Sequence, residues 1–163
     1  MSNVAFQMSG FTILELIISI AIIALLSVGV GVELIAYQRT VALEAASKDI
    51  VSELRTAQNK ALSGEDGTVP PDGAGDAWGI RFSNRTPSTY AKFYGSTFSW
   101  ANVTATTTLP SSVAFTDPSL NTDKDIIFTK ITGTTTPSSI TLQTQDGSQS
   151  QTITVATSSI SVQ

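Results

Sequence analysis

The sequence contains neither cysteine nor histidine among its 163 residues. A chain without them has no disulfide framework, no zinc finger and none of the common haem or iron–sulfur sites, and it cannot form a Ser-His-Asp triad or a cysteine nucleophile. Positive charge is also scarce, because nine Lys and Arg residues stand against thirteen Asp and Glu residues and leave a net charge of -4. An acidic chain lacks the electrostatic field that attracts nucleic acid, so we expect no nucleic-acid partner.

Charged side chains are almost absent from residues 11–32, which have the sequence FTILELIISIAIIALLSVGVGV with Glu15 as the one charged residue. A helix of about 20 apolar residues spans the hydrocarbon layer of a bilayer. Helices of soluble proteins rarely stay apolar on every face over such a length. The sequence therefore predicts a transmembrane half-helix over 11–32, preceded by a short uncharged segment over 1–10.

The helical pattern continues beyond this apolar run, because the chain has no proline between Phe11 and Val69 and no glycine between Gly31 and Gly64. Over 33–63 apolar residues recur at spacings of three and four, which places them along one helical face. We call this face the stripe, and its residues are Leu43, Ala46, Ile50, Leu54, Ala57 and Ala61. We expect one continuous helix of about 50 residues, ending near Gly64, with an amphipathic second half whose stripe is covered by another layer.

After a Gly/Pro-rich loop at 65–76, the hydrophobic period changes to two, which is typical of strands. The apolar residues of these short runs are Trp78, Ile80, Phe82, Tyr90 to Tyr94, Val113 to Phe115, Ile126, Phe128, Ile140, Leu142, Ile153, Val155, Ile160 and Val162. Asp146-Gly147 between two such runs predicts a hairpin. We therefore expect a β-rich globular domain over 64–163, with an antiparallel sheet whose apolar face packs on the stripe, and an α+β fold overall.

Glu15 is the residue that most needs an explanation. A carboxylate in a membrane-spanning helix costs about 2.5–3.5 kcal/mol, so it requires a partner or a purpose. No Lys or Arg precedes Glu15 in the sequence. A cut after Gly10 would create a cationic α-amine on Phe11, one helical turn before Glu15, and the carboxylate would relieve that charge at the helix start. The pair could form within one chain, or between two chains, where it would set the stagger of neighbouring helices.

The segment Gly10-Phe11-Thr12-Ile13-Leu14-Glu15 and the apolar run after it resemble the N-terminus of type IV pilins and type II secretion pseudopilins. The resemblance implies that 1–10 is a leader, that a prepilin peptidase cuts between Gly10 and Phe11 and then methylates the amine of Phe11, and that Glu15 is the assembly carboxylate. It also implies a single-pass protein of the cytoplasmic (inner) membrane, with its C-terminal domain periplasmic or extracellular, that joins other pilin or pseudopilin subunits in a hetero-oligomeric filament.

The helix segment 45–62, the Gly-rich loop and the final strands are similar to the minor pseudopilin H family, which includes minor pilins of type IV pilus systems. This similarity implies a minor subunit near the filament tip. We expect a structural protein without enzymatic activity, with no catalytic residue, no metal and no cofactor. The residues do not distinguish a secretion pseudopilus from a pilus. They also leave open a membrane-anchored surface binding protein that never polymerises, and a secreted hydrolase with an ordinary signal peptide.

Two weaker patterns remain. Asp123 and Asp125, with Asp117 nearby, are candidate calcium ligands, although the spacing of an EF-hand is absent and a turn flanking a strand is the favoured interpretation. Trp78 and Trp100 suggest a sugar-binding surface, but Trp78 belongs to the alternating apolar set and is assigned to the core.

Overall fold

The computed structural model describes residues 11–68 and 73–163, apart from the side chains of residues 27–33. The predicted leader at 1–10, with Gly10, lies outside the described residues. Contacts divide the chain into a unit that ends at Gln38 and a second unit from Arg39 to Gln163.

The helix α1 runs from Ile13 to Ser63, over 51 residues, which confirms the long uninterrupted helix. It ends where predicted, because Gly64 adopts a φ of 66° that an L side chain would disfavour. The N–H of Gly64 donates to the carbonyl of Ala61 at 3.2 Å, and the N–H of Glu65 donates to the carbonyl of Lys60 at 3.0 Å. This pair of bonds is a Schellman motif, which satisfies carbonyls left open by the last turn.

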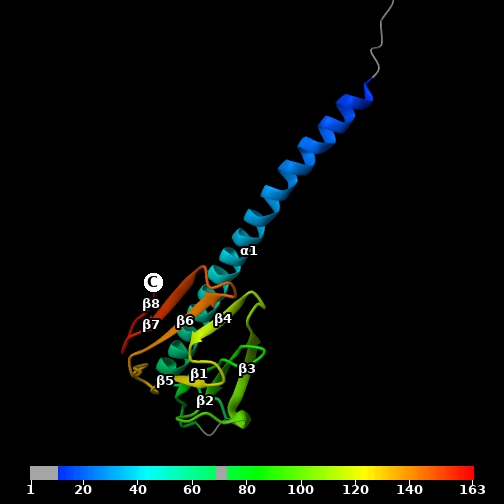
Figure 1. The fold of residues 1–163 in the computed structure, drawn as a ribbon. Coiled ribbons are helices and arrows are strands. Elements are labelled where there is room, and N and C mark those ends of the chain that lie inside the picture. The colour runs from blue at the N-terminus through cyan, green and yellow to red at the C-terminus, as the bar shows by residue number, and fades with distance from the viewer. Residues whose placement is uncertain (1–10, 69–72) are drawn as a thin grey trace, which may run out of the picture. The chain divides into compact units, whose positions relative to one another are not determined.

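The second unit contains two four-stranded antiparallel sheets (Figure 1). The first sheet has the order β3-β2-β1-β5 and the second has the order β4-β6-β7-β8. The strands are β1 (Trp78–Ser83), β2 (Thr89–Tyr94), β3 (Val103–Thr108), β4 (Val113–Asp117), β5 (Asp123–Phe128), β6 (Ser138–Thr144), β7 (Ser150–Val155) and β8 (Ile160–Val162), with a short 3-10 helix η1 (Trp100–Asn102) before β3. The α+β class is confirmed, while the division of the strands between two sheets was not predicted.

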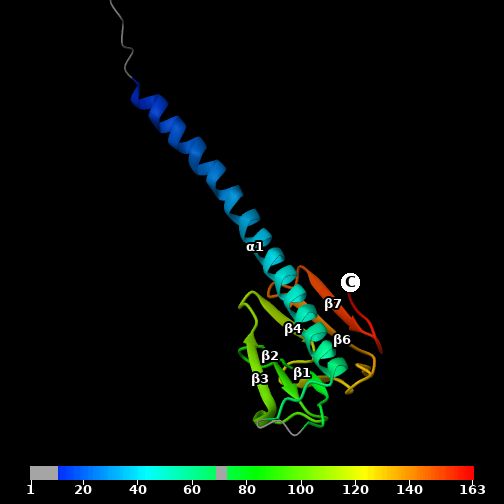
Figure 2. The same ribbon diagram turned by 180° about the vertical axis from the view of Figure 1, so that it is seen from behind.

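The last part of α1 lies against the strands, as the two opposite views show (Figures 1 and 2). The core of this unit consists of apolar side chains from this part of the helix and from both sheets. All six stripe residues are at most 5% exposed, which confirms the predicted face. The same cluster contains Ile80 and Phe82 of the first sheet and Ile140 and Leu142 of the second sheet. Burial of one such side chain contributes about 1.5–3 kcal/mol, so both sheets are held to the helix mainly by apolar contact.

Direct contacts also join the two sheets to each other. The rings of Phe82 in β1 and Phe115 in β4 meet edge to face, with centroids 5.7 Å apart. Asn84, which follows β1 and is 4% exposed, donates from its side-chain amide to the carbonyls of Phe115 at 2.9 Å and Pro118 at 2.8 Å. A buried amide with these partners fixes how the ends of β1 and β4 approach each other.

The predicted hairpin at Asp146-Gly147 connects β6 to β7, and Gly147 has a φ of 73°. The Asp146 carboxylate accepts hydrogen bonds from the hydroxyls of Thr144 at 2.7 Å and Ser148 at 2.8 Å. Arg39 of α1 donates to the same carboxylate at 2.6 Å. The hairpin is therefore attached to the helix by a charge-assisted bond.

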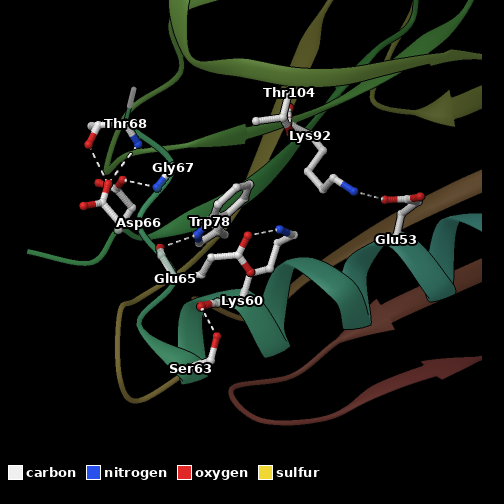
Figure 3. A network of polar contacts seen from close by, with 11 residues as sticks. Glu53, Lys60, Ser63, Glu65, Asp66, Gly67, Thr68, Trp78, Lys92 and Thr104 are labelled. Atoms are coloured by element: carbon white, nitrogen blue, oxygen red, sulfur yellow. Dashed lines mark hydrogen bonds and ion pairs between the residues drawn. The ribbon is translucent and has the colours of Figure 1, made fainter. Parts of the chain in front are cut away.

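Polar contacts attach the end of α1 to the first sheet and to the loop after the helix (Figure 3). The indole N–H of Trp78 donates to the carbonyl of Glu65 at 2.9 Å, and the carboxylate of Glu65 pairs with Lys60. About two turns before Lys60 in α1, Glu53 accepts a bond of 2.9 Å from Lys92 of β2. Trp78 is 2% exposed, which confirms its assignment to the core.

Candidate processing and assembly site

The N-terminal end of α1 is capped by Thr12. The hydroxyl oxygen of Thr12 accepts the N–H of Glu15 at 3.3 Å, and the carbonyl of Thr12 accepts the N–H of Leu16 at 3.2 Å. Threonine at the cap with glutamate three residues later is the sequence pattern of a capping box. This role of Thr12 was missed from the sequence, although the T-x-x-E spacing carries the signal.

Glu15 lies in the first turn of the helix, where a carboxylate interacts favourably with the positive end of the helix dipole. Its carbonyl accepts a bond of 2.7 Å from the hydroxyl of Ser19. Among the residues that the structure describes, no Lys or Arg forms an ion pair with Glu15. Phe11 precedes the cap and is 69% exposed, whereas Gly10 on the other side of the predicted cut is outside the described residues.

The start of α1 is predominantly apolar, because Glu15 and Ser19 are the only polar residues between Ile13 and Leu26. From Phe11 to Leu26 every residue except Ser19 is exposed. The large apolar members range from 50% exposed at Ile18 to 80% exposed at Ile13. Exposed apolar surface of this extent marks a site of contact with lipid or protein.

The described helical residues include no segment with both the length and the apolar character required to cross a membrane. The predicted span over 11–32 extends into 27–33, whose side chains lie outside the description.

The second candidate group, the aspartates near β5, does not lie in a turn, so that prediction was wrong. Asp123 and Asp125 belong to β5 itself. Asp125 accepts two bonds of 2.6 Å from Arg81, and Asp123 accepts bonds of 3.3 and 3.2 Å from Arg85. Hydrogen bonding from Arg85 is the main reason that the pKa of Asp123 lies below its ordinary value.

Asp117 of β4 is likewise engaged, since it accepts two bonds of 2.6 Å from Lys124. Within residues 11–68 and 73–163, no three acidic side chains are grouped so as to hold a metal ion. The carboxylates near β5 therefore bind cations of this chain.

One comparison with known families bears on the helix terminus. Residues 7–31 match the prokaryotic N-terminal methylation motif. The matched segment includes Phe11, the Thr12 cap and Glu15, and it is the part of the chain that carries the resemblance to type IV pilins and pseudopilins. No curated protein and no solved structure matches the chain. The resemblance of 45–62 to pseudopilin H lies outside the matched segment and stays a prediction.

Proposed function

We propose that this protein is a structural subunit, without enzymatic activity, of a type II secretion pseudopilus or a type IV pilus, and that it is a minor subunit. The observation that carries the proposal is the methylation motif at 7–31. The motif includes the helical residues 13–26, whose large apolar side chains are exposed. The free energy of a helix with this surface falls when lipid or the helices of other subunits cover it.

In the proposed pathway a prepilin peptidase cuts between Gly10 and Phe11 and methylates the new amine. Methylation of an amine keeps its positive charge. No Lys or Arg among the described residues pairs with Glu15, so the ammonium of Phe11 would supply its cation. This pair would offset part of the cost of a carboxylate in lipid. The pair forms within one chain in the membrane, or between neighbouring chains in the filament.

The proposed location is the inner membrane, with one crossing by the first half of α1 and the β-rich domain at 64–163 on the periplasmic or extracellular side. After extraction from lipid, the same apolar side chains would pack against the helices of other subunits. Only van der Waals contact and polar pairs can select the stagger of apolar helices in lipid, and Glu15 is the polar group available for this purpose.

Mass spectrometry of the mature N-terminus tests the processing step. We expect a chain that begins at Phe11 and carries one additional methyl group on its amine. A product that keeps residues 1–10 would contradict the processing proposal. A product that begins beyond the apolar run would identify an ordinary signal peptide, as the alternative of a secreted hydrolase requires.

Replacement of Glu15 tests assembly separately from membrane insertion. We expect Glu15→Gln to lose filament incorporation, measured by recovery in sheared or purified filaments, while the protein remains in the membrane fraction. Glu44→Gln is the matched control, because Glu44 is an exposed glutamate of α1 that pairs with Lys48. If Glu15→Gln assembles as the unmodified protein does, or if neither protein enters filaments, the alternative of a non-polymerising anchored binding protein is supported.

A further inference from the structure

The face of the first sheet that points away from α1 contains an open groove of about 440 Å³. Arg81 lies on this face because it alternates in β1 with the buried residues Ile80 and Phe82. The strand register places Ala91 of β2 and Asp125 of β5 on either side of Arg81. A volume of this size falls in the range of small-molecule sites.

Trp100 lines the groove and is 71% exposed. Its ring meets Phe98 edge to face at 5.0 Å, and Phe98 meets Phe93 in the same manner at 5.2 Å. Phe93 is fully buried, and the guanidinium of Arg81 lies 3.6 Å from the centre of the Phe98 ring. Trp100 thus packs against Phe98, and Phe98 packs against the buried Phe93. Most of the indole stays open to solvent, although burial of an aromatic ring is normally favourable.

The polar side chains beside the indole are arranged as charge-balanced pairs. Arg81 is paired with Asp125, and Arg85 is paired with Asp123, which also accepts a bond of 2.8 Å from Ser83. Each guanidinium is therefore paired with a carboxylate, of which Asp123 lines the groove and Asp125 lies beside it, so no unpaired charge is left to select an ion. A guanidinium has five N–H groups and a carboxylate has about four lone-pair sites, so each pair keeps unused donors and acceptors that a ligand can contact.

We propose that this groove binds a neutral carbohydrate, with one pyranose ring stacked on Trp100 and its hydroxyl groups hydrogen-bonded to Arg85 and Asp123. A pyranose has an apolar C–H face that suits an exposed indole, and each hydroxyl both donates and accepts, as the paired charges require. A protein partner would bury about 800 Å² on this side, far more than one small groove offers. The proposal does not depend on the filament function.

Quenching of tryptophan fluorescence by iodide provides the test, because the two tryptophans differ in exposure. Trp100 is 71% exposed and accessible to the quencher, whereas Trp78 is 2% exposed and serves as an internal reference. The full chain is kept in zwitterionic micelles without a sugar headgroup, and the probes are cellobiose, chitobiose, lactose and maltose. We expect at least one disaccharide to protect the quenchable fraction saturably at about millimolar concentration.

Three variants, measured by isothermal titration with the protecting sugar, locate the site. Trp100→Ala is expected to weaken binding by about tenfold or more, as truncation of a central aromatic contact does. Arg85→Gln is expected to weaken it as well, and provides a second variant should Trp100→Ala fold poorly. Leu120→Ala is the matched control, because Leu120 is 69% exposed and does not line the groove, so its affinity should be unchanged.

Three results would overturn the proposal. The first is the absence of protection by all four disaccharides up to about 50 mM, far above the affinity expected of a useful site. The second is undiminished affinity in both folded groove variants. The third is protection of Trp100 that rises with protein concentration and needs no sugar, which would identify the groove as an interface with a second copy of the chain.

Discussion

The side-chain amide of Asn84 donates a hydrogen bond of 2.9 Å to the backbone carbonyl of Phe115, and so joins the end of one sheet to the other. Asn84→Ala removes this bond and the bond to Pro118, and leaves two carbonyls without this donor. We expect a loss of about 2 kcal/mol in the free energy of unfolding, measured by urea titration. Asn59→Ala, on the exposed side of α1, should change stability by less than about 0.5 kcal/mol. Equal effects of the two substitutions would contradict a structural role for the buried amide.

Leu54 and Arg55 are neighbours in sequence whose side chains point about 100° apart around α1. Leu54 is fully buried in the stripe, whereas Arg55 is exposed. Leu54→Ala removes buried methyl groups and leaves a cavity, so we expect a loss of about 2–5 kcal/mol in urea unfolding. Arg55→Ala should stay within about 0.5 kcal/mol of the unmodified protein. A reversed order would show that the stripe is not the face that the sheets cover.

The Thr12 hydroxyl should decide how firmly the start of α1 is held. Thr12→Val keeps the size of the side chain but removes the acceptor for the N–H of Glu15. We expect a local loss of about 1 kcal/mol, seen as an increase of about fivefold in hydrogen exchange at the amide of Glu15. Thr12→Ser keeps the acceptor and should exchange as the unmodified chain does. Identical exchange in all three proteins would argue against the cap.

Asp146 should contribute to the pH dependence of stability. Hydrogen bonds from Thr144 and Ser148, followed by Arg39, hold the pKa of Asp146 below its ordinary value of 3.8. A carboxyl whose pKa is lower in the folded state stabilises the protein above 3.8, and this contribution disappears as the pH falls through the folded pKa. The difference in stability between the unmodified protein and Asp146→Asn should therefore shrink as the pH is lowered from about 6 to about 2.

Arg39→Gln provides the comparison for this pH effect. Arg39 contributes less to the lowered pKa of Asp146 than the hydroxyls of Thr144 and Ser148 do. The variant should therefore keep most of the acid sensitivity that Asp146→Asn loses. If Arg39→Gln abolishes the sensitivity as completely as Asp146→Asn, the ion pair rather than the hairpin hydroxyls controls the titration.

Ile131 has a φ of 70°, which a β-branched residue rarely adopts, and it is 71% exposed. Ile131→Gly relieves the left-handed strain and loses little burial, so we expect stabilisation of about 1 kcal/mol in thermal or urea unfolding. Leu120→Gly is the matched control, because Leu120 is also exposed but has no positive φ. That control should lose stability through the greater freedom of glycine in the unfolded chain. Destabilisation by both substitutions would mean that the loop holds Ile131 without strain.

The helix, its stripe and its end at Gly64 could be predicted because each depends on local sequence: a period near four and the positions of glycine and proline. Pairing between strands could not, since a period of two does not specify which strand lies beside which. β5 pairs with β1, for example, although three other strands separate them in the sequence. β3 was missed because its sequence VTATTT is mostly exposed and has no large apolar residue after Val103.

The candidate sites divide in the same way. The capping pattern of Thr12 and Glu15 is contained in four consecutive residues and could be found from the sequence. The support of Trp100 by Phe93 and Phe98 depends on the turn after β2, where Gly95 has a φ of 106°, and on ring geometry. The pairing of Asp125 with Arg81 depends on the β1–β5 register, so a sequence interpretation placed the aspartates in a turn instead.

The stripe belongs to one cluster with apolar residues of both sheets. During synthesis the helix therefore emerges before the strands that cover it, and the part of the stripe that the second sheet covers stays exposed until β6 and β7 have paired. A chain whose synthesis stopped after β5 would lack β6, β7 and β8 of the second sheet. Its exposed apolar residues would make it vulnerable to proteases and to association with other chains. Completion of this domain thus waits for its last strands, whatever the order in which the earlier hairpins close.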